Sequence, residues 1–481
     1  MPGIRNLLTH ADPRVEILRD ADIDPDGQCV LLWVQRAQRA TANHAANLAV
    51  ELADELGLPV IAGFCLSPGF PSATLRAYTF MAEGLAELPE AFARRHIGWD
   101  LVVGQPPEVI PAMARRLRAA LIVTDLNPLR VGRDWRRDVA EGIDIPLVQV
   151  DSDTVVPSSL FPRAEFAPRT IRPRILKRLD EFLHPIPDPS PHRHSTHRSG
   201  PDPLDEIGKD SFDLDREIPP STILRGGAQE AHRRLGSFVR DTLPLYDVLR
   251  DRSDLDQTSH LSPYLHFGQI GPIEVVMAAR DAVAGEHYQS FIDEVVVQRE
   301  LSINYVLHVE DYDQYKGLPD WGRETLEAHA GDERPVIYTP EQLARGETHD
   351  PLWNAAQRQL VVEGFMNNRM RLYWGKQIPL WRPTPKAAYD TLAWLNDRFF
   401  VCGRDANSYA NISWVIGGRH DRPFPADRPV TGTVRPMTDA AIKRSFRPQD
   451  YIAMVEDRYG VPGPRPEANE GPTTKQARLD I

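Results

Sequence analysis

The pattern of apolar and polar residues differs between the two halves of the chain. Short apolar runs rich in strand formers alternate with amphipathic helical stretches over the first third, beginning with CVLLWVQ (29–35) and TANHAANLAVELADELG (41–57). The second stretch predicts a helix with Thr41 as its N-cap and Gly57 as its stop. This strand–helix alternation predicts an α/β domain, a parallel, Rossmann-like sheet covered by helices.

Long amphipathic helices dominate the sequence from about residue 219 onward, with few strand-like runs between them. We therefore expect an α/β domain over 15–160, an interdomain linker over 161–218 and an all-helical domain over 219–460. Proline, serine and histidine crowd residues 184–203, so we expect no regular structure there. Residues 461–481 have the composition of a disordered tail.

Cysteine and histidine spacing gives little support for a metal site. Cys29, Cys65 and Cys402 lie too far apart for a disulfide framework or a zinc pattern, and the first two fall in runs that predict buried strands. Of the 15 histidines, a group lies in 184–203. A metal site and an exposed linker remain alternatives there, and the admixture of proline, serine and arginine favours the linker.

The bulk composition is that of a globular protein, with 41% hydrophobic and 26% charged residues. No apolar run is long enough to span a bilayer, and the first residues do not resemble a secretory signal, so we expect a cytoplasmic protein that binds no membrane. The net charge of -12 argues against non-specific coating of nucleic acid. Residues 168–179 and 433–447 are locally basic, either as solvated faces or as DNA-binding ones.

Common catalytic and nucleotide-binding motifs are absent from the sequence. No G-x-G-x-x-G follows the first strand, and the chain has no P-loop, G-x-S-x-G, H-E-x-x-H or paired C-x-x-C motif. Arg36 and Arg39 directly follow the first strand, where an anionic ligand could bind.

Two polar segments of the carboxyl half could form a binding site. TSHLSPYLHFGQI (258–270) offers hydroxyls and backbone N–H groups at a helix start, which suits a phosphate, although Ser262 could equally cap the helix before Pro263. The segment 395–422 gathers amides and charges before the apolar run ISWVIGG. It predicts either a polar pocket or an exposed loop.

Three tryptophans, Trp353, Trp374 and Trp381, lie within one short region of the helical half. Trp374 and Trp381 are two helical turns apart and so share a face, while Trp353 belongs to a preceding helical segment. Core packing is the ordinary explanation for such a stripe. The functional alternative is a series of oxidisable indoles that passes electrons.

Taken in order, TSHLSPYLHFGQI, QREL, WNAAQ, MRLYW, LNDR…GRD, SWVIGG and KRSF resemble the class II cyclobutane pyrimidine dimer photolyases. In the amino half, WVQRAQR, TDLNPLRVGRDW and RTIRPRI are similar to the same class, so the resemblance covers about residues 15 to 460. It implies the photolyase/cryptochrome architecture, with an amino-terminal α/β domain and a helical FAD-binding domain. It also implies blue-light-driven repair, in which reduced FAD passes an electron to a dimer flipped out of DNA.

The resemblance assigns roles to individual residues and implies a monomer that needs damaged DNA but no protein partner and no metal. Cofactor binding is implied for Tyr246, Thr258, Ser259, Leu261, Ser262, Arg299, Arg371, Asn396, Cys402 and Asp405. Catalytic contacts are implied for Glu300 and Trp414 at the lesion and for Asn396 near flavin N5. Electron transfer is implied for Trp353, Trp374 and Trp381, and DNA contact for Arg422 and Arg435.

The sequence departs from this class around the expected flavin. Cys402 stands where the class has an aspartate that pairs with the equivalent of Arg371, and Leu372 replaces a methionine. Ser408 and Asn411 lie in a stretch that is usually richer in glycine. These changes leave open an alternative, a photolyase-derived flavoprotein that senses light or acts on another ligand. An antenna chromophore such as a deazaflavin is compatible with the resemblance, and no residue pattern decides it.

Overall fold

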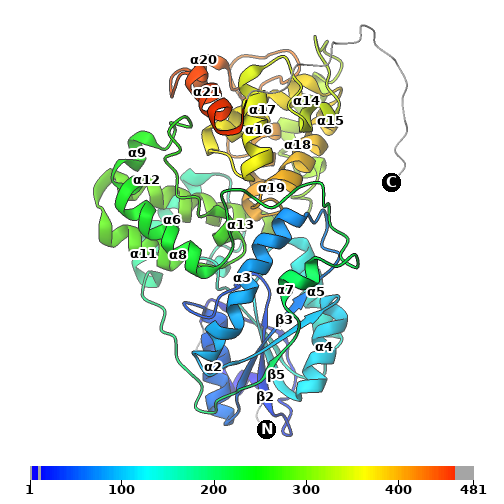
Figure 1. The fold of residues 1–481 in the computed structure, drawn as a ribbon, viewed down its shortest axis with the longest axis vertical. Coiled ribbons are helices and arrows are strands. Elements are labelled where there is room, and N and C mark those ends of the chain that lie inside the picture. The colour runs from blue at the N-terminus through cyan, green and yellow to red at the C-terminus, as the bar shows by residue number, and fades with distance from the viewer. Residues whose placement is uncertain (1–2, 9–11, 461–481) are drawn as a thin grey trace.

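The computed structural model describes residues 3–8 and 12–460 (Figure 1). Its amino-terminal part is built on a seven-stranded sheet with the order β1-β6-β5-β2-β3-β4-β7. The strands are β1 (Val15–Arg19), β2 (Cys29–Val34), β3 (Val60–Leu66), β4 (Gly98–Val103), β5 (Ala119–Asp125), β6 (Leu147–Val150) and β7 (Arg198–Ser199). All neighbouring pairs are parallel except β1 with β6, which confirms the predicted parallel sheet and adds one antiparallel edge.

Helices cover both faces of the sheet. The four main ones are α2 (His44–Leu56), α3 (Leu75–Ala93), α4 (Pro106–Leu117) and α5 (Arg130–Glu141). The core on one face joins α2 and α3 to Val30 and Leu32, and the core on the other joins α4 and α5 to Leu31. Strands β2 and β3 are therefore buried along their whole length, and Cys29 and Cys65 lie in them as predicted.

The boundaries of α2 are partly as expected. Gly57 ends the helix in the left-handed conformation, with φ 64°. The N-cap is Asn43 and not Thr41, because the Asn43 side chain accepts hydrogen bonds from the backbone of Ala45 and Ala46.

The carboxyl half is helical, as predicted. After α1 (Ile4–Leu7) and the α/β helices, the chain forms α6 (Pro168–Phe182), α7 (Pro203–Ile207), α8 (Ala228–Ser237), α9 (Tyr246–Leu249), α10 (Ser262–His266), α11 (Pro272–Ala282), α12 (Gly285–Ile292), a π-helical turn η4 (Asp293–Gln298), α13 (Arg299–His308), α14 (Asp320–Ala328), α15 (Pro340–Ala344), α16 (Pro351–Glu363), α17 (Asn368–Trp381), α18 (Pro385–Phe399), α19 (Ala406–Gly417), α20 (Asp439–Ile442) and α21 (Pro448–Tyr459). Shorter 3-10 or π turns are η1 (Ser158–Leu160), η2 (Phe238–Thr242), η3 (Leu243–Leu245) and η5 (Tyr315–Gly317). The expected disordered tail, 461–481, lies outside the described residues.

The proline-rich segment 184–203 crosses the outer edge of the sheet. Its Arg198 and Ser199 pair in register with Trp99 and Asp100 of β4, so the prediction of no regular structure is wrong at this point. The physical reason is that an exposed strand edge pairs with any backbone held alongside it. His197 also lies 2.9 Å from a carboxylate oxygen of Asp100.

A buried network of charges joins the two halves of the molecule. Arg36, just after β2, forms ion pairs with Asp153 and, at 2.8 Å, with Asp405 at the start of α19. Arg299 of α13 binds the same Asp153 at 2.7 Å. His266 lies 3.3 Å from Asp405, whose pKa is held well below its ordinary value by Arg36 and His266 in spite of its burial.

Protein groups therefore take the place of the anionic ligand that could bind Arg36 and Arg39. Both guanidinium groups are buried, and Arg39 donates hydrogen bonds to the carbonyls of Gly268 at 3.0 Å and Ser152 at 2.5 Å. Through these contacts both arginines link the sheet to the helical half.

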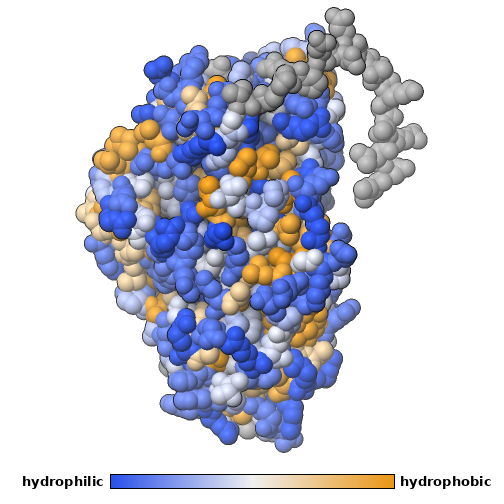
Figure 2. All heavy atoms as spheres, viewed as in Figure 1, coloured by the Kyte–Doolittle hydropathy of each residue, from blue (hydrophilic) through white to orange (hydrophobic). Residues whose placement is uncertain are grey.

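Hydrophilic side chains cover most of the face shown in Figure 2. Hydrophobic side chains gather over α9, where Val248 and the preceding Leu245 are exposed. None of the helices in residues 3–8 and 12–460 is both long and apolar enough to cross a bilayer.

Candidate active site

The helical half holds a large cavity, about 1470 Å³ when its open mouth is included. Its lining includes these predicted cofactor residues: Tyr246, Thr258, Ser259, Leu261, Ser262, Arg299, Arg371, Cys402 and Asp405. Asn396 instead lines a small void behind the cavity wall, next to Arg371. Residues far apart in the sequence thus meet around one space.

One wall of the cavity carries polar atoms that lack partners. The Thr258 hydroxyl oxygen and His260 Nδ1 are buried without a hydrogen bond to any described residue. Asp256 holds the other ring nitrogen of His260 at 2.8 Å. Buried polar atoms without partners are costly, so this wall is suited to a ligand rich in oxygen atoms.

Ser262 does not cap α10, contrary to one of the alternatives for this segment. The N-cap is Leu261, and the Ser262 hydroxyl donates to Cys402 Sγ at 3.6 Å. Both side chains line the cavity, so this contact joins α10 to the segment before α19 at the cavity wall.

Arg371 places a positive charge at the cavity wall. Its guanidinium lies 4.0 Å from the ring centre of Phe400 and donates hydrogen bonds to the Asn396 side-chain oxygen and to the Ser408 hydroxyl. The Asn396 amide in turn donates to Asp397 at 2.8 Å. No carboxylate of the described residues forms an ion pair with Arg371, and the Asn396 amide lies between its guanidinium and Asp397, whose pKa burial raises and the Arg371 charge helps to lower.

Glu294 lines the same cavity, although the sequence did not single it out. It lies in the π-helical turn η4 and accepts a hydrogen bond from Arg250 at 2.8 Å. Burial raises the pKa of its carboxyl, and Arg250 only partly opposes this. Trp414 shares the lining and donates its indole N–H to Asp421 at 2.9 Å.

The structure does not bring Glu300 into the cavity. Its Oε1 accepts hydrogen bonds from the backbone N–H groups of Val155 and Val156, at 2.6 and 3.2 Å, in the loop that follows β6. Its Oε2 is buried without a partner, and burial raises its pKa to about 8. Arg299, one residue earlier on α13, lines the cavity, and the helical turn of about 100° per residue directs Glu300 toward the sheet.

The three tryptophans form a continuous series that starts at the cavity wall. The rings of Trp374 and Phe400 are 6.1 Å apart, and Phe400 itself lines the cavity. Trp374 stacks on Trp353 at 6.1 Å, and Trp353 meets Trp381 edge-on at 5.5 Å. All three belong to the hydrophobic core, so the packing explanation holds, and their order also fits a path for electrons.

Known proteins share both the sequence and the fold. A sequence model described as DNA photolyase matches residues 30–191. The deoxyribodipyrimidine photo-lyase of Methanothermobacter thermautotrophicus is 36% identical over 449 residues, covering 93% of this chain and 99% of that protein. The chain belongs to the DNA photolyase family. The photolyase of the same name from Potorous tridactylus is 36% identical and covers 89% of this chain and 82% of its own.

Solved photolyase structures confirm the fold. A bacterial class III photolyase from Agrobacterium tumefaciens has a TM-score of 0.69 at 19% identity and covers 90% of this chain and 87% of its own. An archaeal photolyase from Sulfolobus tokodaii, determined with two FAD molecules, has a TM-score of 0.64 at 16% identity and covers 92% and 96%. The resemblance and the predicted photolyase/cryptochrome architecture are thereby confirmed.

The two arginines expected to contact DNA have no ion-pair partners in the part of the chain that the structure describes, whereas several basic residues of 168–179 do. Arg422 and Arg435 are exposed, and neither forms an ion pair within residues 3–8 and 12–460. On α6, by contrast, Arg172 binds Asp293 at 2.6 Å, and Arg174 and Arg178 also pair with nearby glutamates. Much of the α6 charge is therefore neutralised.

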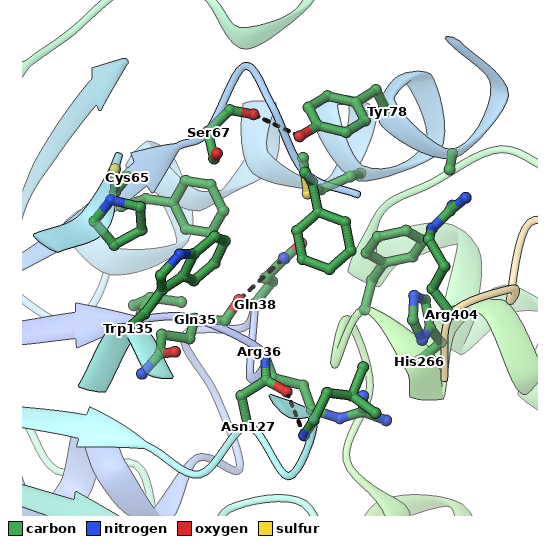
Figure 3. A pocket seen from close by; sticks show the side chains of 18 of the residues that line it. Gln35, Arg36, Gln38, Cys65, Ser67, Tyr78, Asn127, Trp135, His266 and Arg404 are labelled. Carbon is green, nitrogen blue, oxygen red and sulfur yellow. Dashed lines mark hydrogen bonds between the residues drawn. The ribbon is translucent and has the colours of Figure 1, made fainter. Parts of the chain in front are cut away.

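A second cavity lies between the sheet and the helical half (Figure 3). It measures about 830 Å³ with its mouth and has Gln35 and Ser67 at the carboxyl ends of β2 and β3. Tyr78 and Trp135 contribute aromatic walls, and His266 reaches it from the helical half. This is the position at which α/β sheets bind ligands.

Proposed function

We propose that this protein uses blue light to split cyclobutane pyrimidine dimers in DNA, with FAD bound in the large cavity. One observation carries the proposal: Phe400 at the cavity wall contacts Arg371 on one side and the tryptophan series on the other. A light-driven flavin enzyme needs this combination of a charged flavin pocket and a path for electrons. The names of the 36% identical relatives support the same reaction.

The cavity fits FAD in chemical terms. Thr258 and His260 offer the unpartnered buried atoms described above, and Ser259 adds a hydroxyl, which together suit the diphosphate and sugar oxygens. Arg371, with Asn396 behind it, would lie against the isoalloxazine and offset negative charge there. When bound and reduced, FAD supplies the photoexcited electron that opens the dimer.

Glu294 and Trp414 would receive the flipped dimer. A carboxyl group whose pKa is raised by burial stays protonated to a higher pH and so donates a hydrogen bond to a pyrimidine carbonyl. The Trp414 indole offers a flat apolar surface on which an extruded base stacks. Arg422 and Arg435 would bind phosphates of the surrounding backbone.

The direct test is to illuminate the reduced protein with an oligonucleotide that contains one thymine dimer and to measure intact thymine by chromatography. Repair in the light and none in the dark is expected. Absence of repair in both would refute the proposal. Intact photoreduction with equal affinity for damaged and undamaged DNA would favour light sensing instead.

The second cavity is proposed to bind an antenna chromophore. Its aromatic side chains, Phe64, Phe70, Tyr78 and Trp135, suit a planar ring system such as a deazaflavin or a second flavin. An absorption spectrum of the purified protein tests this, since an antenna adds a band to those of FAD. Flavin bands alone, after supply of candidate chromophores during expression, would contradict it.

Restoring a carboxylate with Cys402→Asp is expected to lower the reduction potential of the bound flavin. Cys402 lines the cavity, as does Arg371, which forms no ion pair with any described residue. Two unit charges about 4 Å apart interact by roughly 4 kcal/mol at an effective dielectric constant near 20 and by less at longer range, so a carboxylate in the same cavity disfavours negative charge on the ring. Spectroelectrochemical titration measures the shift, with Cys402→Ser as the uncharged control. Equal potentials in the two variants would show that the carboxylate is without effect.

A further inference from the structure

A third cavity lies beside the active site, against α17 and α19, and measures about 1140 Å³ with its mouth. Its walls are mostly apolar: Pro379, Leu380, Val415, Ile416, Pro429, Val434, Pro436 and Met437. The lining also includes three cationic side chains, Lys376, Arg428 and Arg435, and no carboxylate among the side chains that the structure describes. In a chain of net charge -12, this is a locally cationic space with apolar walls.

Lys376 is the residue that most needs a partner. Its ammonium nitrogen is shielded from solvent and forms no hydrogen bond with any described residue. Burial and Arg435 lower its pKa to about 8, against the opposing effect of Asp421. That carboxylate accepts the Trp414 indole N–H at 2.9 Å and forms no ion pair with Lys376. A buried ammonium without a counter-charge is costly to keep, so an anion is the expected occupant of the space beside it.

Consecutive residues of α19 connect this cavity to the site of repair. Trp414 lines the large active-site cavity, whereas Val415 lines the cationic one. The two cavities therefore lie on different sides of α19, and one helix diameter, roughly 10 Å, separates the cationic cavity from the position proposed for the flipped dimer. Arg435, one of the exposed arginines expected to meet DNA, lines the same cavity.

We propose that the cationic cavity binds a backbone phosphate of the DNA next to the flipped dimer, with Lys376 and Arg435 as its cationic partners and the apolar walls against the sugar. The inference rests on the proposed function, because it takes damaged DNA as the substrate. It adds Lys376, which no motif indicated, to the DNA-binding residues. The side chain acts in substrate binding and takes no part in the electron transfer.

The test measures the affinity of the FAD-loaded protein for dimer-containing DNA over a range of salt concentrations. Lys376→Met is expected to weaken binding roughly tenfold and to reduce the slope of log Kd against log salt by about one contact. Lys376→Arg should keep the wild-type affinity and the wild-type salt slope. Lys386→Met is the matched control, since Lys386 is exposed on α18 and pairs with Asp390 at 2.6 Å. The melting temperature of Lys376→Met should not fall, because the lost ammonium has no partner among the described residues of the free protein.

A second measurement needs no destabilising variant. If a phosphate binds the Lys376 ammonium, the side chain must be protonated in the complex. Above the pKa of the free side chain, DNA binding is therefore accompanied by uptake of one proton. The affinity of the wild-type protein should then fall between about pH 8 and 9 by up to roughly tenfold more than that of Lys376→Arg, which does not titrate there. The groups that face Lys376 and could alter this dependence are Asp421, Arg428 and Arg435.

The outcomes separate this inference from the proposed function. Unchanged affinity and salt slope in folded Lys376→Met, with the wild type still selecting and repairing dimer-containing DNA, would overturn the inference alone. A rise in melting temperature with inorganic pyrophosphate, together with unchanged DNA binding, would assign the cavity to a free phosphorylated molecule and overturn it as well. Loss of dimer repair by the wild type would count against the proposed function instead.

Discussion

Replacing Trp374 with phenylalanine is expected to slow light-driven reduction of the bound flavin roughly a hundredfold, about 2.7 kcal/mol in activation free energy. Trp374 stands between Phe400 at the cavity wall and Trp353, with ring separations of 6.1 Å on both sides. Phenylalanine keeps most of the packing but is far harder to oxidise than an indole. The rate of flavin bleaching in blue light with an external reductant measures the effect.

Trp394→Phe is the matched control for this substitution. Trp394 is exposed on α18, contacts Arg398 and lies outside the buried series. Its variant should photoreduce at the wild-type rate. The Trp374 variant, once reduced chemically, should still repair dimers, because under the proposed function the series supplies electrons only to restore the flavin. Wild-type photoreduction in Trp374→Phe would remove Trp374 from the electron path.

Replacing Glu294 with alanine is expected to reduce dimer repair per absorbed photon roughly tenfold or more. Glu294 lines the cavity with Trp414, and burial raises the pKa of its carboxyl, which favours the protonated form that would donate to a pyrimidine carbonyl. Repair of a dimer-containing oligonucleotide by the chemically reduced protein measures the loss. The sign of the pH dependence follows from the same proton: wild-type repair should decline as pH rises through the folded-state pKa of Glu294.

Glu300→Gln provides the comparison, since Glu300 faces the loop after β6. Glutamine keeps the oxygen that accepts the Val155 and Val156 N–H groups, so repair should be unchanged. Stability should respond differently. The pKa of Glu300 is about 8 in the folded protein, above the ordinary value of about 4.3, so its contribution to stability falls as pH rises between these values. The gain in melting temperature from Glu300→Gln should therefore be larger at about pH 8 than at about pH 5.5. If Glu300→Gln lost repair while Glu294→Ala stayed active, Glu300 and not Glu294 would be the residue that binds the dimer.

The fold could be predicted where one local pattern dominates. The strands β2 and β3 are apolar throughout because both faces of the sheet are covered, and Gly57 ends its helix in a conformation that glycine adopts readily. Strand β7 could not be predicted, because Arg198 and Ser199 have no strand propensity of their own and pair only with the edge that β4 presents. Tertiary contact overrides local preference there.

The candidate site shows the same division. Thr258, Ser259 and Ser262 come from one continuous motif and share one cavity. Which glutamate faces the cavity depends on the rotation of the helix. The π-helical turn at Asp293–Gln298 changes that rotation, so the sequence pattern indicated Glu300 where the structure has Glu294. The burial of Arg36 depends on Asp153 and Asp405, which are 117 and 369 positions away. A local sequence pattern cannot predict ion-pair partners so far apart in the chain.

The charges that meet around Arg36 make the two halves of the molecule a single cooperative unit. The helical half expressed by itself would leave Asp405 without Arg36 and Arg299 without Asp153, and removing one member of a buried ion pair costs roughly 3–5 kcal/mol. Asp405 also lines the large cavity, so separation of the halves would disturb the wall of that cavity. The α/β half is thus required for the catalytic half to hold its shape, whether or not it carries a chromophore.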